Sequence, residues 1–271
     1  DDLNIDLKTL LHSISKKTKV VAFQRSSGYQ IRPAFTMSYL ENIFKQVKKA
    51  NPHLFIFVDN CYGEFVEKVE PTMIGADLIA GSFLKNPGAG LTSGGGYLAG
   101  KKELIQRIES LFFSPGLHDI GPSLVDNRLY FQGLYLAPLF IRETLQGLTL
   151  LSYVFSKLGF TVFPRHDEER SDTVLGIILG SPEKMLSFCQ MVQKNSPIDS
   201  FVVPLPAEMP GYDNKIIMAG GTFVQGSSME FSADGPFIEP YTVFLQGGFY
   251  QEQLILFCIK IAEKIIKEKE F

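Results

Sequence analysis

The chain has 271 residues, 45% of them hydrophobic, which is enough to bury one large core or two smaller ones. Its 26 basic and 29 acidic side chains give a formal net charge of −3, which provides no electrostatic attraction for nucleic acid or an acidic membrane. The cysteines are three and widely spaced, and the four histidines are scattered, so we expect no disulfide framework and no metal site. We expect no nucleic-acid or membrane partner, and a reducing, cytoplasmic location.

The first half of the chain alternates helices and strands. Leucines at helical spacing predict a first helix, and Thr36 is a candidate N-cap for a second one that ends near Ala50. The continuous apolar run at 54–58 predicts a central parallel strand that is covered on both faces. This alternation predicts an α/β protein with a doubly wound, mostly parallel sheet. The predicted helices cover residues 3–15, 36–50 and 101–113, and the predicted strands cover 20–23, 54–58, 77–81 and 97–100.

The second half begins with a long predicted helix from about residue 127 to 158, which Gly159 ends. Short β-rich runs follow, and Ser181 is a candidate cap for a helix with a proline in its first turn. We therefore predict a large domain over 1–158 and a small C-terminal α/β domain over 159–271, joined by the long helix. The predicted strands cover 160–163, 173–179, 215–218 and 242–245, and the last helix covers 251–269.

Lys85 and Asp59 are the main candidates for chemistry. Asp59 ends the apolar strand at 54–58, and Lys85 follows the next predicted strand and precedes a glycine-rich turn. Because ligands of such sheets bind beyond the carboxyl ends of the strands, the two side chains should lie on one rim. A lysine that forms a Schiff base and an acid that protonates a pyridine nitrogen are the groups that pyridoxal phosphate needs. The alternative interpretation is a buried salt bridge or two unrelated surface groups.

Five further residues are candidates on the same rim. Ser82 could hold a phosphate or cap a helix, and Tyr62 could contact a ligand or belong to the core. Cys61 is expected to be a small thiol beside the cofactor rather than a nucleophile. Arg25 and Arg32 could bind a carboxylate of the substrate or a phosphate, or they could be ordinary surface arginines.

The order of these motifs resembles the fold-type I pyridoxal phosphate enzymes, in particular the cystathionine β-lyase and methionine γ-lyase branch. The chain is most similar to the bacterial group named for aluminium resistance within that branch, and the similarity extends along nearly the whole sequence. The strings that carry it include Val58-Asp59-Asn60-Cys61-Tyr62-Gly63-Glu64-Phe65, Gly75-Ala76-Asp77, Lys85-Asn86-Pro87-Gly88, Met209-Pro210-Gly211-Tyr212 and Gly221-Thr222-Phe223-Val224-Gln225-Gly226.

This resemblance implies a pyridoxal-phosphate-dependent lyase that acts on a small amino-acid substrate. It implies a homodimer or homotetramer with shared active sites, in which Lys85 is the Schiff-base lysine, Asp59 the partner of the pyridine nitrogen and Ser82 a phosphate ligand. Cys61 and Tyr62 would lie beside the cofactor. No metal is implied.

The chain also departs from that family pattern. Leu84 stands where the related lyases usually have threonine or a similar residue, and the segment 233–240 lacks the arginine expected to bind a substrate carboxylate. The glycine- and serine-rich phosphate loop is not found among the first 58 residues, so we expect the large domain to be incomplete at its N-terminus.

The expected reaction is β- or γ-elimination from cystathionine, cysteine or methionine. Two alternatives stay open at this point: a pyridoxal phosphate enzyme of another reaction type, such as an aldolase or a racemase, and a non-catalytic, stress-associated relative.

Overall fold

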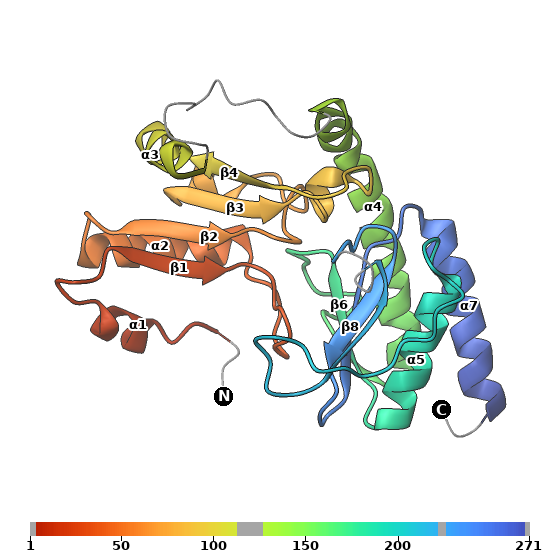
Figure 1. Cartoon of the computed structure of the whole chain (residues 1–271). Helices are drawn as coiled ribbons and strands as arrows, with labels where there is room; N and C mark the ends of the chain where they lie inside the picture. The colour runs from red at the N-terminus through yellow and green to blue at the C-terminus, as the bar shows by residue number, and fades with distance from the viewer. Residues whose placement is uncertain (1–3, 113–126, 222–225, 269–271) are drawn as a thin grey trace.

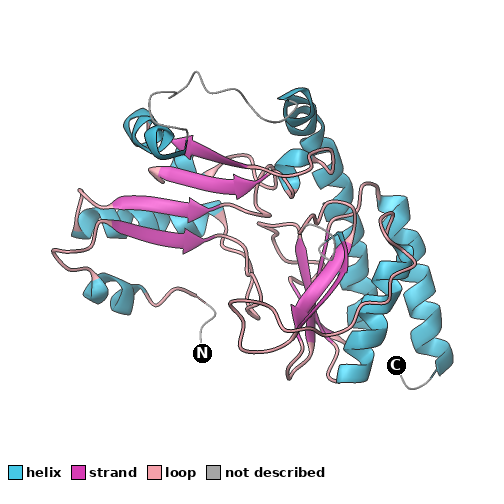
Figure 2. Ribbon diagram, in the orientation of Figure 1, coloured by secondary structure: helices cyan, strands magenta, loops and turns pink. Residues whose placement is uncertain are grey.

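The computed structural model describes residues 4–112, 127–221 and 226–268. Two β-sheets lie next to each other and are connected by the long helix α4 (Asn127–Lys157), as Figure 1 shows. The prediction of an α/β protein is confirmed, with helices packed around both sheets (Figure 2). No helix in the described part of the chain is long and apolar enough to cross a membrane.

The first sheet has the order β1-β2-β3-β4. Its first three strands are parallel and β4 is antiparallel to β3, so the sheet is mixed. In the parallel part Gln24 pairs with Asp59 and Asp59 pairs with Ala80, which brings the carboxyl ends of these strands to one edge. The strands are β1 (Val20–Gln24), β2 (Phe55–Asp59), β3 (Leu78–Ser82) and β4 (Gly96–Gly100).

Helices α1 (Leu7–Ser13), α2 (Met37–Ala50) and α3 (Lys102–Phe112) accompany this sheet. The predicted cap of α2 is confirmed, because the Thr36 hydroxyl accepts a hydrogen bond from the Tyr39 amide at 3.2 Å. The apolar side of α2 is fully buried against the strands and forms the first core with them.

The second sheet is antiparallel throughout and has the order β5-β6-β9-β8-β7. Helices α4, α5 (Pro182–Asn195) and α7 (Gln251–Glu268) pack beside it and enclose the largest core. The Ser181 cap of α5 is present, since its hydroxyl accepts from the Lys184 amide at 3.3 Å. The strands are β5 (Thr161–Phe163), β6 (Val174–Ile178), β7 (Ile216–Gly220), β8 (Ser232–Pro236) and β9 (Thr242–Gln246).

Strand β8 has no counterpart among the strands predicted from the sequence. Its sequence is Ser-Ala-Asp-Gly-Pro, which shows no apolar alternation. Asp, Gly, Pro and, to a lesser degree, Ala are residue types that occur less often in strands than elsewhere. The strand forms because β7 and β9 pair with it on both sides and bury it. Tertiary pairing therefore overrides a local preference for a turn.

The turn after Lys85 packs directly against α4. The short 3₁₀ helix η2 (Asn86–Gly88) starts next to Lys85, and its backbone touches α4 at Gly133. A Cβ atom on Gly133 would lie 2.7 Å from the carbonyl oxygen of Gly88, which is closer than atoms can approach. The glycine thus permits the close contact that supports the Lys85 turn.

We predict that Gly133→Ala destabilises the protein by about 1–3 kcal/mol, because the obstructing atoms are backbone and the turn must move. Urea denaturation measures this change. The control is Gly94→Ala, where the added Cβ would meet no atom within 4 Å. Equal stability of the two variants would contradict the role given to Gly133.

Candidate active site

A cavity of about 360 Å³ lies where the first sheet faces the second. Residues of the loop after β1 and Lys85 line it from the first half of the chain, and residues of the second sheet line it from the other side. The described residues that line it are Gln24, Ser26, Ser27, Gly28, Tyr29, Gln30, Tyr62, Lys85, Val174, Tyr212, Asp234 and Gln246. Lys85 and Tyr62 are therefore the predicted site residues that line this cavity.

Lys85 is held by a tight turn at the end of β3. The Ser82 carbonyl accepts from the Lys85 amide at 3.2 Å, and the Ser82 hydroxyl accepts from the Leu84 amide at 3.1 Å. The Lys85 ammonium lies 4.7 Å from the centroid of the Tyr62 ring, within the range of a cation–π interaction. The turn thus places an amine at the cavity, and the Ser82 hydroxyl contributes to the turn itself.

Asp59 and Cys61 are not among the cavity-lining residues. Asp59 pairs with Ala80 of β3, the strand that leads to Lys85, and the Lys85 charge acts on the Cys61 thiol. An Asp59 carboxylate oxygen accepts from the Cys61 amide at 3.0 Å. Burial raises the pKa of the Cys61 thiol to about 12, against a smaller opposing effect of the Lys85 charge. Cys61 is therefore protonated at neutral pH, as expected for a small thiol near the site rather than a nucleophile.

Tyr62 has a backbone conformation that few non-glycine residues adopt, with φ at 69°. Its carbonyl oxygen accepts from the Asn86 side chain and from the Thr173 amide, both at 3.0 Å. Because Asn86 is the neighbour of Lys85 and Thr173 precedes β6, these bonds tie the Lys85 turn to the second sheet.

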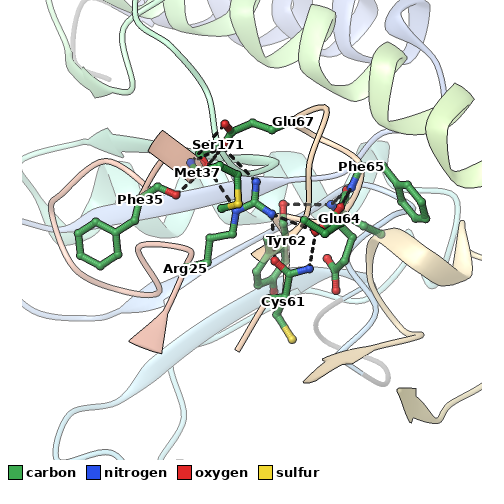
Figure 3. Close-up of polar contacts among 12 residues, drawn as sticks. Arg25, Phe35, Met37, Cys61, Tyr62, Glu64, Phe65, Glu67 and Ser171 are labelled. Atoms are coloured by element: carbon green, nitrogen blue, oxygen red, sulfur yellow. Dashed lines mark hydrogen bonds and ion pairs between the residues drawn. The ribbon is translucent and has the colours of Figure 1, made fainter. Parts of the chain in front are cut away.

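Arg25 is completely buried and has internal partners (Figure 3). Its guanidinium donates to the Asn60 side chain at 2.9 Å and to Ser171 at 3.3 Å, and it pairs with Glu67 at 3.2 Å and with Glu70 at 3.4 Å. These contacts give Arg25 a structural role. The expectation that it binds a substrate carboxylate finds no support in them.

Arg32 has internal partners as well. Its guanidinium donates to the Gln24 and Ser26 carbonyls, at 3.2 and 2.8 Å, and lies 4.0 Å from the centroid of the Phe35 ring. Burial lowers the pKa of Arg32. The side chain holds the loop after β1 in place, and neither it nor Arg25 lines the cavity.

The second sheet contributes an acid that the sequence interpretation missed. Asp234 of β8 is 6% exposed, and one of its carboxylate oxygens accepts from the Gln246 side-chain amide at 3.0 Å. Burial raises its pKa to about 7, while Tyr29, Lys85 and Gln246 act in the opposite direction. No pattern in the sequence marks Asp234, because the strand that carries it is itself not recognisable.

A second buried acid, Glu64, lies in the segment between β2 and β3. The Tyr97 hydroxyl donates to Glu64 Oε1 at 2.9 Å, whereas Oε2 is buried without a hydrogen-bond partner. Burial raises the pKa of Glu64 to about 8. An uncharged carboxyl group is the form that suits this environment.

The sequence model of the methionine gamma-lyase family matches residues 1–266. This chain belongs to the methionine gamma-lyase family. The resemblance inferred from the sequence motifs is thereby confirmed.

Several members and solved structures are similar to this chain. The uncharacterised protein YnbB of Bacillus subtilis is 46% identical over 248 residues, which are 91% of this chain and 59% of YnbB. A Listeria monocytogenes structure, named as a candidate cystathionine beta-lyase involved in aluminium resistance, superposes with a TM-score of 0.90 at 40% identity. The match covers 96% of this chain and 64% of that one, so this chain spans less than two thirds of both relatives.

Two further structures extend the comparison. A Clostridium novyi protein, named as a carbon-sulfur lyase involved in aluminium resistance, superposes with a TM-score of 0.87 at 39% identity and covers 96% of this chain and 61% of its own. Yeast cystathionine gamma-lyase superposes with a TM-score of 0.59 at 17% identity, which shows a common fold.

We predict that Arg25→Met lowers the free energy of unfolding of this protein by about 3 kcal/mol or more, because it leaves the partly buried acids Glu67 and Glu70 without their cation. The control is Arg142→Met on α4, whose ion pair with Glu143 is exposed on the arginine side and should contribute less than about 1 kcal/mol. Urea denaturation compares the two. A substrate-binding role would instead appear as a higher KM with unchanged stability.

We predict that Glu64 makes stability fall as the pH rises from about 5 to about 8. Its pKa is higher in the folded chain than the ordinary value of 4.5, so in this interval the folded state binds more protons than the unfolded state. Glu64→Gln should flatten this slope in urea denaturation, whereas Glu239→Gln, at an exposed acid, should retain it. Parallel slopes in all three proteins would rule out a buried, protonated Glu64.

Proposed function

We propose that this chain provides the lysine and the acid of a pyridoxal-phosphate-dependent carbon–sulfur lyase that acts on a sulfur amino acid. The observation that carries the proposal is the place of Lys85, whose amine reaches a cavity next to the strand end that bears Asp59. Membership of the methionine gamma-lyase family supports the same assignment.

The residues present fit this cofactor. Lys85 supplies a primary amine at a cavity large enough for a pyridine ring, and the Tyr62 ring lies against that amine. Asp59 is half-buried at the end of the neighbouring strand, with one carboxylate oxygen engaged by the Cys61 amide. Ser82 lies at the end of β3, where its hydroxyl proton could be donated to a phosphate group.

Pyridoxal phosphate, when bound, supplies an electron sink for the negative charge that develops at the substrate α-carbon. Lys85 would hold the cofactor and, after exchange with the substrate amine, would take the proton from that carbon. The Asp59 carboxylate would hold a proton on the pyridine nitrogen. A thiol would then leave from the β or γ carbon, as in β- or γ-elimination from cystathionine, cysteine or methionine.

We further propose the fold-type I arrangement for the complete protein, with the cofactor on the large domain at 1–158 and the small domain at 159–271, in a cytoplasmic homodimer or homotetramer. The N-terminal part of α4 supports a subunit contact, because Phe131 is 71% and Tyr135 is 86% exposed. Leu134 and Leu139 extend this apolar surface along the same helix.

A second candidate is a related protein with another pyridoxal phosphate reaction, or without catalysis. The internal hydrogen bonds of Arg25 and Arg32 favour this candidate. The described residues that line the cavity include no arginine, so none of them offers a guanidinium to a substrate carboxylate. Product analysis separates the cases, since a lyase releases thiol and ammonia, whereas an aldolase or a racemase yields other amino acids.

We predict that the protein binds pyridoxal phosphate with a visible absorption band that borohydride abolishes. Lys85→Ala should lose this band and lower thiol release by at least about a thousandfold, since it removes both the attachment point and the proton acceptor. Lys102→Ala, at an exposed lysine of α3, is the control and should keep both. A band that persists in Lys85→Ala would refute the assignment.

A further inference from the structure

The cavity beside Lys85 has opposite charges on its two walls. Lys85 is the cation and Asp234 the anion among the described residues that line it, and the other lining side chains are uncharged. The two charges act on one another, because Lys85 lowers the pKa of Asp234. The small-domain wall therefore presents a carboxylate to whatever enters the cavity opposite Lys85.

Next to this carboxylate lies an amide oxygen without a donor. Gln246 is 3% exposed, and its Nε2 donates to Asp234, but its Oε1 is buried and has no hydrogen-bond partner. A buried acceptor in this state lowers the stability of the folded chain until a donor reaches it. Asp234 and Gln246 together are thus a pair of acceptors at the cavity wall.

An ammonium group is the ligand that matches such a pair. It has three N–H donors and no acceptor, and its positive charge offsets the cost of a buried carboxylate. A substrate carboxylate would meet repulsion here, because Asp234 is an acid and the arginines Arg25 and Arg32 are engaged elsewhere. The wall is therefore suited to a cation.

We propose that Asp234 and Gln246 bind a second ammonium group on the substrate, so that the lyase prefers thioether amino acids whose leaving thiol carries a positive charge. This inference rests on the proposed lyase function and adds the substrate class to it. Asp234 is the specificity-determining residue, and Gln246 holds it in place and adds an acceptor.

Two nearly isosteric compounds test the preference. S-(2-aminoethyl)-L-cysteine carries an ammonium group where S-propyl-L-cysteine carries a methyl group, and thiol release from each by the enzyme loaded with pyridoxal phosphate gives two kcat/KM values. We expect the ratio of the cationic to the neutral compound to fall at least about tenfold in Asp234→Asn, because a charge-assisted hydrogen bond contributes about 1.5–3 kcal/mol. The matched control, Glu239→Gln, neutralises an exposed acid just beyond β8 and should keep the wild-type ratio.

The pH dependence of the unmodified protein gives a second measurement that needs no variant. The groups whose charges or dipoles act with Asp234 are Lys85, Tyr29, Tyr62 and Cys189, besides the Gln246 amide. Since the ordinary pKa of an alkylammonium is about 10, the compound stays charged while Asp234 takes up a proton below about pH 7. The preference for the cationic compound should therefore weaken from pH 8 to pH 6 in the wild type and stay constant in Asp234→Asn.

Binding can be followed apart from turnover. The measured quantity is the concentration of each compound at which half of the change in the visible cofactor band has occurred. In Asp234→Asn this concentration should rise more for the cationic compound than for the neutral one. Equal changes for both compounds, or a wild-type ratio that does not depend on pH, would overturn the proposal and leave Asp234 a structural acid. A protein that has no cofactor band and releases no thiol from either compound would instead overturn the proposed lyase function.

Discussion

The buried guanidinium of Arg25 is the constraint on which the rest of the site depends. An arginine with no exposed surface must be fully paired, because an uncompensated charge in the interior costs several kcal/mol. Its partners come from three places in the chain: Asn60 after β2, the acids Glu67 and Glu70, and Ser171 before β6. Satisfying one side chain therefore fixes the position of three segments at once.

The same segments lead directly to Lys85. The carbonyl of Tyr62, two residues after Asn60, accepts hydrogen bonds from Asn86 and Thr173. Asn86 directly follows Lys85 in the sequence, and Thr173 lies two residues after Ser171. Close packing of Gly133 against η2 supports this turn from the other side. The turn that carries Lys85 is thus held by contacts from both halves of the chain, which is the rigidity that a functional site requires.

The charge on the cavity walls depends on which charged side chains are already occupied by structural contacts. The arginines that would have suited a substrate carboxylate are used to hold loops, and the acid Asp234 faces the cavity instead. An amine on one wall and a carboxylate on the other impose an orientation on any amino acid that enters. In the function proposed above, Lys85 would carry the chemistry common to the family and the opposite wall would select the substrate.

The sequence by itself determined the local structure and the rim of the site. Helix periodicity and caps located α2 and α5. Because parallel strands end at one edge, the sequence also predicted that the strand end with Asp59 adjoins the strand that leads to Lys85, and Asp59 pairs with Ala80 of that strand. Only the tertiary structure decided which contacts Arg25 makes and that Asp234 lines the cavity. The Arg25 partner Ser171 is 146 residues away in sequence, and β8 forms only because β7 and β9 pair with it, so neither interaction leaves a local pattern to recognise.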